Sequence, residues 1–113
     1  MAVLLNDSEI AGRLKRLRGW KHEGAFIAKI FKFKEFVDGI AFVDSIAKIA
    51  EEEGHHPDID VRYTTVRLCL QTHSEGGVTE LDFGLAGRIE GSLERRRRTS
   101  VKRRYAPIRH RVH

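Results

Sequence analysis

The chain has 113 residues, a length that fits one domain with one modest hydrophobic core. Its formal net charge of +5 is unevenly placed: residues 92–113 hold nine Lys or Arg and one Glu, whereas the rest holds twelve cations against fifteen acidic residues. The pI of 9.7 therefore describes a basic tail on a mildly acidic domain and is weak evidence that the domain itself binds nucleic acid.

The composition also bears on location. The single cysteine, Cys69, excludes a disulfide within the chain and indicates a reducing compartment. The first residues, MAVLL, lack a basic flank and are followed at once by polar residues, so they are too short for the apolar core of a signal peptide. No apolar run approaches the roughly 18 residues of a membrane span. We therefore expect a cytoplasmic protein, or a nuclear one if its source has a nucleus, with no membrane association.

The first half of the chain predicts a helix, two strands and a long helix. Residues 6–17 have the pattern of a short amphipathic helix that Asn6 or Asp7 caps and Gly19 stops. Strands are expected at residues 20–23 and 25–33, the second with apolar residues on both faces, so that both of its faces are expected to be largely covered. Residues 34–53 predict a helix that ends at Gly54. Its apolar stripe is expected at Phe36, Ile40, Val43, Ala47 and Ala50, widened by Ile46 and Ile49.

The second half predicts two more strands and a last helix. After residue 57 the apolar period becomes two, which predicts strands at 58–63 and 66–72 joined by a hairpin around 63–65. A loop at 74–77 leads to a helix over 79–93, with Thr79 as N-cap and Asp82 completing a capping box. The inward stripe of this helix is expected at Leu81, Leu85 and Ile89. The order predicts an α+β domain in which a four-stranded, mainly antiparallel sheet carries three helices on one face, helix-ββα-ββα.

We expect residues 1–94 to form the folded domain and residues 95–113 a basic, flexible tail. The cations of the tail are able to contact phosphates of RNA or DNA. Against that, the tail offers only Tyr105 for base stacking and no recognition motif, which favours a solvated or nonspecific tail.

Three of the six histidines, His55, His56 and His73, flank the second pair of strands. In a hairpin around residues 63–65, residue 56 falls almost opposite residue 73, so the histidines are expected to converge at one end of the sheet. For any single histidine, a surface or capping role is the ordinary alternative. Three imidazoles also suit a metal site, but adjacent strand residues point to opposite faces and no HExxH or CxxC motif is present. Acid–base chemistry near neutral pH fits the group better.

The spacing around these histidines resembles the pterin-4a-carbinolamine dehydratases, the family that includes the dimerisation cofactor of hepatic homeodomain transcription factors. The family signature places an acidic residue, His-His-Pro, an aromatic residue, a histidine and an aspartate at set intervals. It is met here by Glu51, His55, His56, Pro57, Tyr63, His73 and Asp82. The resemblance includes GW at 19–20, FKFKEF at 31–36 and GVTELDFGLA at 77–86, and it covers about residues 5–93, without the tail.

The resemblance implies a 4a-hydroxytetrahydrobiopterin dehydratase, which eliminates water from the 4a-carbinolamine to give the quinonoid dihydropterin in tetrahydrobiopterin recycling. Proton transfer suffices for this step, so no metal or redox cofactor is expected. By the family pattern, His55 and His73 form the acid–base pair and His56 binds and orients the pterin. The implied pocket is lined by Gly54, His55, His56, Gln71, Thr72, His73 and Ser74.

The other motif residues are expected to support the site. Glu51 would orient a histidine, and Asp82 would cap the last helix. Pro57 would end the long helix before the strand, and Tyr63 would pack in the hairpin. Two departures from the family affect how the pterin is held: Asp58, Ile59 and Asp60 stand where an aromatic is frequent, and Gln71 replaces a small hydroxyl residue.

The resemblance also admits a non-enzymatic interaction role. Members of this fold act as transcriptional dimerisation partners and, in a degenerate branch, assist Rubisco assembly. An assembly factor has no need of three intact histidines, so their presence favours the enzyme. The family further implies a homodimer or homotetramer, which exposed apolar positions on the helices would suit.

Overall fold

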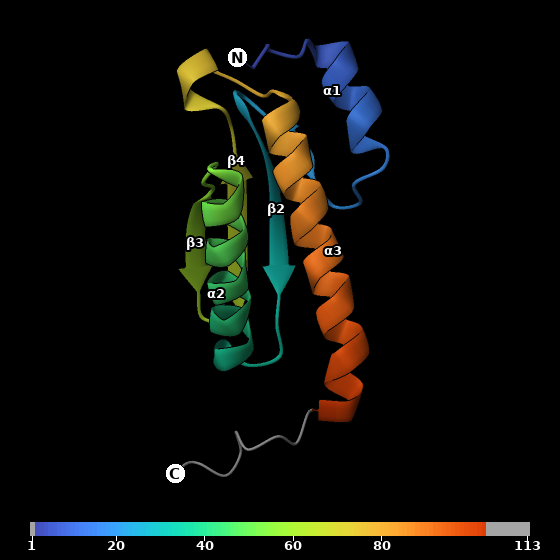
Figure 1. The fold of residues 1–113 in the computed structure, drawn as a ribbon, viewed down its shortest axis with the longest axis vertical. Helices are drawn as coiled ribbons and strands as arrows, with labels where there is room; N and C mark the ends of the chain where they lie inside the picture. Colours follow the sequence, from blue (N-terminus) through green and yellow to red (C-terminus); the bar gives the residue numbers. More distant parts are fainter. Residues whose placement is uncertain (1, 104–113) are drawn as a thin grey trace.

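The computed structural model describes residues 2–103 (Figure 1), with side chains as far as residue 96. Its elements are α1 (Asp7–Leu14), β1 (Lys21–Glu23), β2 (Phe26–Lys32), α2 (Phe36–Glu53), β3 (Asp58–Arg62), β4 (Thr65–Leu70), a 3₁₀ turn η1 (His73–Glu75) and α3 (Glu80–Arg103). The strands form one antiparallel sheet in the order β1-β2-β4-β3. The predicted α+β fold is confirmed.

The helices lie on one face of this sheet and share a single core with it (Figure 1). Alternate residues of β2 and β4 point into the core, as the period of two requires, and Phe31 of β2 packs against Phe42 of α2 with ring centroids 4.7 Å apart. Ile10 of α1 and Ile89 of α3 complete the core. On the other face Ile30 is exposed, so the expectation that both faces of β2 are covered was wrong there.

The buried stripe of α2 differs from the predicted one. The predicted stripe residues Phe36, Ile40 and Ala47 are exposed, and the buried residues are Gly39, Phe42, Ile46, Ile49 and Ala50. Ile46, Ile49 and Ala50 of the predicted stripe are buried as expected. The first half of the helix turns a different face to the sheet, with Gly39 and Phe42 inward, and a Cβ built at Gly39 would lie 3.5 Å from both Phe33 and Val66.

Helix boundaries also differ from the prediction. Helix α1 is shorter than residues 6–17, whereas α3 continues to Arg103 instead of ending at residue 93. Arginine has a high helix propensity, so the loss of apolar periodicity after Leu93 did not end the helix. Leu81, predicted to face inward, is exposed. No helix among residues 2–103 has the length and apolar character to cross a membrane. The expected tail from residue 104 onward lies outside the described residues.

The β3–β4 hairpin turns more tightly than predicted. Arg62 pairs with Thr65, which leaves a two-residue turn in which Tyr63 has a φ of +54°. Extending this register places residue 56 opposite residue 71, so the predicted facing of 56 and 73 was wrong by two residues. Tyr63 is exposed at the end of β3 away from the histidines, so its expected packing role was also wrong.

Candidate active site

A left-handed turn at the end of α2 positions His55. The N–H of Gly54 donates to the carbonyl of Glu51 at 3.3 Å, and the N–H of His55 donates to the carbonyl of Ala50 at 3.1 Å. This pair of bonds is the Schellman motif, and it favours glycine at residue 54, where φ is +64°. Residues 55–57 then belong to neither helix nor strand, so the two adjacent histidines are released from strand alternation.

His73 comes from a short loop between β4 and α3 that backbone hydrogen bonds close. The N–H of Thr72 donates to the carbonyl of Gly77 at 2.8 Å, and the two residues form an isolated β-bridge. Inside the loop, the N–H groups of Glu75 and Gly76 donate to the carbonyl of Thr72 at 2.9 and 3.0 Å. His73 therefore begins a constrained turn, although its side chain is exposed.

One cavity of about 360 Å³ brings the three histidines together. Its lining consists of Gly54, His55, His56, Gln71, Thr72, His73, Ser74 and Leu81. The predicted convergence of the histidines is thus confirmed, although the register used to infer it was wrong. All seven residues expected to line a pterin pocket contribute to this cavity. Leu81 was missed because its sequence position matched the core stripe of α3, and it adds an apolar wall.

A buried hydrogen-bond network holds His55. Nε2 of His55 lies 2.6 Å from Oδ1 of Asp82, and the two side chains are 13% and 0% exposed. The other carboxylate oxygen, Oδ2, accepts the Thr72 hydroxyl and the Thr79 N–H, both at 2.9 Å. An ionised carboxylate only accepts hydrogen bonds, so Nε2–H of His55 donates to Asp82 in this short contact. In the neutral imidazole, Nδ1 is then the ring nitrogen without a proton.

The hydroxyl groups of this network are also accounted for. Thr72 and Thr79 have their Oγ1 atoms 2.7 Å apart, and since Thr72 donates to Asp82, Thr79 donates to Thr72. Oγ1 of Thr79 in turn accepts the N–H of Leu81 at 3.1 Å. Thr79 and Asp82 cap the start of α3 as predicted, but the capping box is only partly formed, because the N–H of Asp82 donates to the carbonyl of Thr79 and not to its side chain. The aspartate serves both the helix and the histidine.

His56 has its own carboxylate, in a different setting. Its Nε2 lies 2.6 Å from Oε2 of Glu51, as the expected orienting role of Glu51 requires, but the side chains are 60% and 76% exposed. Such an exposed pair contributes little to stability. Pro57 and Tyr63 are not among the residues that line the cavity. Within residues 2–103, no three His, Cys, Asp or Glu side chains lie close enough together to hold a metal ion.

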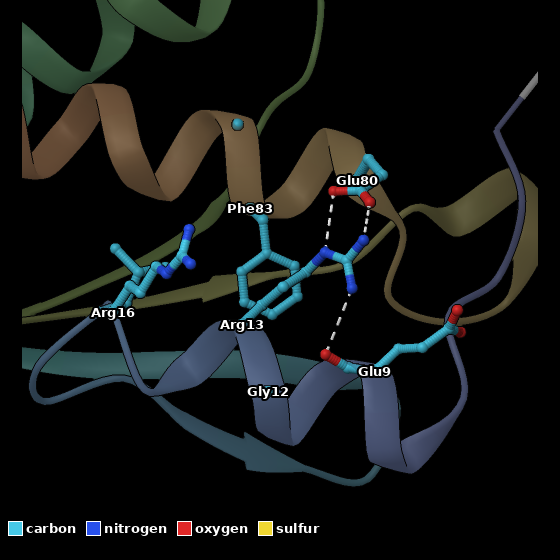
Figure 2. Close-up of a pocket in the computed structure, with 8 residues that line it drawn as sticks. Glu9, Gly12, Arg13, Arg16, Glu80 and Phe83 are labelled. Carbon is cyan, nitrogen blue, oxygen red and sulfur yellow. Dashed lines mark hydrogen bonds and ion pairs between the residues drawn. The ribbon is translucent and has the colours of Figure 1, made fainter.

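A larger cavity, of about 670 Å³, lies between α1 and α3 (Figure 2). Figure 2 shows the Phe83 ring between the two helices and the Arg13 guanidinium reaching the carboxylate of Glu80. This hydrogen bond raises the pKa of Arg13 above its ordinary value. The lining contains no histidine and no cysteine, and Arg13 and Glu80 are engaged with each other. By its chemistry, the smaller histidine cavity is the better candidate for an active site.

The fold and the histidine cavity together define an α+β domain with a candidate acid–base site at one end of its sheet. Comparison with known families gives the particular assignment. The chain belongs to the pterin 4 alpha carbinolamine dehydratase family, whose model matches residues 3–92. The family inferred from the His-His-Pro motif is thereby confirmed.

Individual relatives agree with this assignment. A protein of Roseiflexus castenholzii, provisionally named pterin-4-alpha-carbinolamine dehydratase, is 51% identical over 90 residues, which cover 80% of this chain and 97% of the relative. A crystal structure from Brucella melitensis, described as a transcriptional coactivator/pterin dehydratase, has a TM-score of 0.76 and 37% identity over 79% of this chain and 97% of its own.

A more distant structural neighbour is described as a pterin dehydratase-like RuBisCO assembly factor of the alpha-carboxysome. It has a TM-score of 0.53 and 27% identity, and the match covers 64% of this chain and 83% of the neighbour. The descriptions of these relatives span enzymatic and non-enzymatic roles.

Proposed function

We propose that this protein is a cytoplasmic 4a-hydroxytetrahydrobiopterin dehydratase, a lyase that acts in tetrahydrobiopterin recycling. The observation that carries the proposal is the cavity in which His55, His56 and His73 meet, with His55 held by the buried carboxylate of Asp82. Family membership supplies the substrate class, a pterin 4a-carbinolamine.

The reaction removes the 4a hydroxyl with one proton added to it and one proton taken from a ring nitrogen, so that water leaves. We assign the base to His55, because Nε2–H donation to Asp82 leaves Nδ1 to accept the proton, and the carboxylate then stabilises the imidazolium that forms. His73 is the acid that protonates the leaving hydroxyl. The two imidazoles end each turnover with their protonation states exchanged, and proton exchange with water restores them.

The remaining lining residues are assigned to binding. His56 orients the pterin, and Gln71 offers both an amide donor and an amide acceptor to the polar edge of the heterocycle. Leu81 provides an apolar surface for the flat ring. Together with Gly54, Thr72 and Ser74, these residues form the proposed substrate pocket.

The direct test is a stopped-flow assay with synthetic 4a-carbinolamine, in which the rate with protein is compared with the uncatalysed rate. Replacing His55 and His73 together with Ala should reduce the rate to the uncatalysed value. His22→Gln is the matched control, because His22 lies in β1 and is not among the residues lining the cavity. Full activity in the double variant would refute the assignment.

An interaction role is the second candidate, since the Brucella neighbour is described as a coactivator and the more distant one as an assembly factor. Wild-type protein that fails to accelerate dehydration would support this candidate over the enzyme. In either case we expect a homodimer or homotetramer, because Phe36, Val37 and Ile40 expose apolar surface along α2. Light scattering measures the mass directly, and a monomer at micromolar concentration would contradict this expectation.

A further inference from the structure

Helix α3 extends beyond the part of the chain that its relatives share. The family model ends at residue 92, and the Roseiflexus relative covers 97% of its own length but only 80% of this chain. Among the residues of α3 whose burial is described, 80–96, Leu93 is the last buried one. The helix nevertheless continues to Arg103, and in Figure 1 its red end reaches past the strands and α2. Residues 94–103, the helical extension, span about 15 Å at 1.5 Å per residue.

The helical extension is densely basic. It holds Arg95, Arg96, Arg97, Arg98, Lys102 and Arg103, and Glu94 is the single acidic residue of 92–113. Nη1 of Arg96 donates to Oγ of Ser45 in α2 at 3.0 Å, which ties the start of the extension to the domain. Helical geometry places positions 95, 98 and 102 on one side of the backbone, at separations of three and four residues. The sequence thus sets a row of cationic positions along one side of the extension.

We propose that the helical extension binds the phosphate backbone of nucleic acid without reading base sequence. Val101 is its one apolar residue, so the extension lacks the apolar face that membrane-surface helices bury. It has no aromatic residue for base stacking. Its chemistry is therefore that of phosphate contacts, which give affinity and salt dependence but no specificity. This binding is independent of the proposed dehydratase activity.

The strength of the effect follows from counterion release. The binding constant for duplex DNA varies with salt to a power of about −0.9 per phosphate contact, so each contact contributes roughly an eightfold factor at 0.1 M salt relative to 1 M. Removing four cations, of which two or more contact phosphates, should weaken binding about 60-fold or more at 0.1 M salt. The slope of log K against log salt should flatten by about 2 to 4.

The experiment measures fluorescence anisotropy of a labelled 20-base-pair DNA duplex against the full-length protein from 50 to 300 mM salt. The test variant carries Arg97→Gln, Arg98→Gln, Lys102→Gln and Arg103→Gln, which keep good helix formers. The control variant carries Lys15→Gln, Arg16→Gln, Lys34→Gln and Lys48→Gln, exposed positions in the domain, so that net charge changes equally. We expect the test variant to lose affinity and salt slope, the control to bind like wild type, and both to keep wild-type dehydration rates.

Three results would overturn the proposal. These are the absence of saturable binding by wild type at 50 mM salt, an equal loss of affinity in the control variant, and tighter binding to vesicles of 3:1 phosphatidylcholine and phosphatidylserine than to the duplex. The last result would assign the extension to anionic membranes instead. Dehydratase assays on the same samples keep this test separate from that of the catalytic assignment.

Discussion

Replacement of Asp82 with Asn tests how the protein sets the proton on His55. Oδ2 of Asp82 accepts both the Thr72 hydroxyl and the Thr79 N–H, so the carbonyl oxygen of an asparagine would occupy that position. Its NH₂ group would then lie at the position of Oδ1, which is 2.6 Å from Nε2 of His55. Because the amide donates, Nε2 must accept, and the imidazole proton moves to Nδ1, the nitrogen proposed as the base.

The expected loss is large in rate and moderate in stability. Removal of a positioned general base costs about 10²- to 10⁴-fold, and we expect kcat of Asp82→Asn to fall within this range. A neutral hydrogen bond replaces the charge-assisted one to His55, and the two threonine-side bonds lose their charged acceptor, so the free energy of unfolding should fall by about 1–3 kcal/mol. A domain of ordinary stability, about 5–15 kcal/mol, remains folded after such a loss.

Three measurements separate positioning from a structural role. Stopped-flow dehydration gives kcat, urea denaturation gives stability, and NMR of ¹⁵N-labelled imidazoles reports which ring nitrogen carries the proton. We expect the Nε2–H tautomer of His55 in wild type and the Nδ1–H tautomer in the variant. A folded Asp82→Asn protein with a rate within threefold of wild type, or with an unchanged tautomer, would refute the reasoning.

Other predictions concern single features of the fold and site. Gly39→Ala should raise the free energy of unfolding by up to about 1 kcal/mol in urea denaturation, because the new Cβ meets Phe33 and Val66 at an ordinary 3.5 Å; a loss would contradict this. Gly54→Ala should lower it by about 1–2 kcal/mol, since residue 54 has a φ of +64°, and an unchanged midpoint would show that this turn relaxes. Burial raises the pKa of the Cys69 thiol, so iodoacetamide at about pH 8 should alkylate the folded protein more slowly than the urea-unfolded chain; equal rates would contradict the burial. EDTA should leave dehydration unchanged, and a rate restored specifically by zinc would indicate a metal site.

The sequence predicted the elements well, because local signals dominate them. The alternation of apolar and polar residues on both sides of Tyr63 predicted β3 and β4. Gly54, which tolerates a positive φ, predicted the end of α2. The stripe of α2 was misplaced in its first half because apolar residues occur on more than one face of this helix, and Gly39 gives no apolar signal for the buried one. Gly39 lies close to Val66, which is distant in sequence and invisible to a local pattern.

Most residues of the candidate site were predictable from the sequence, but the hydrogen bonds that connect them were not. The motif spacing identified the histidines, Glu51 and Asp82, and capping explained Asp82 from local sequence alone. The hydrogen bond from His55 to Asp82 joins residues 27 positions apart, and it forms only because the end of α2 meets the start of α3. No local signal indicates that Thr72 completes the same network. Leu81 was missed since its position in α3 satisfies both a core stripe and a cavity wall.

The two histidine–carboxylate pairs also differ in what they are able to do. Both have an Nε2 to carboxylate distance of 2.6 Å, but Asp82 is fully buried and has three hydrogen-bond partners, whereas Glu51 is 76% exposed. Water competes for the exposed carboxylate and screens its charge, so it holds its imidazole weakly. Glu51→Gln should therefore reduce kcat less than about tenfold and act mainly on KM, through the orienting role proposed for His56. Comparable losses of kcat in Glu51→Gln and Asp82→Asn would mean that burial of the carboxylate does not distinguish the catalytic roles of His55 and His56. The base would then have to be reassigned.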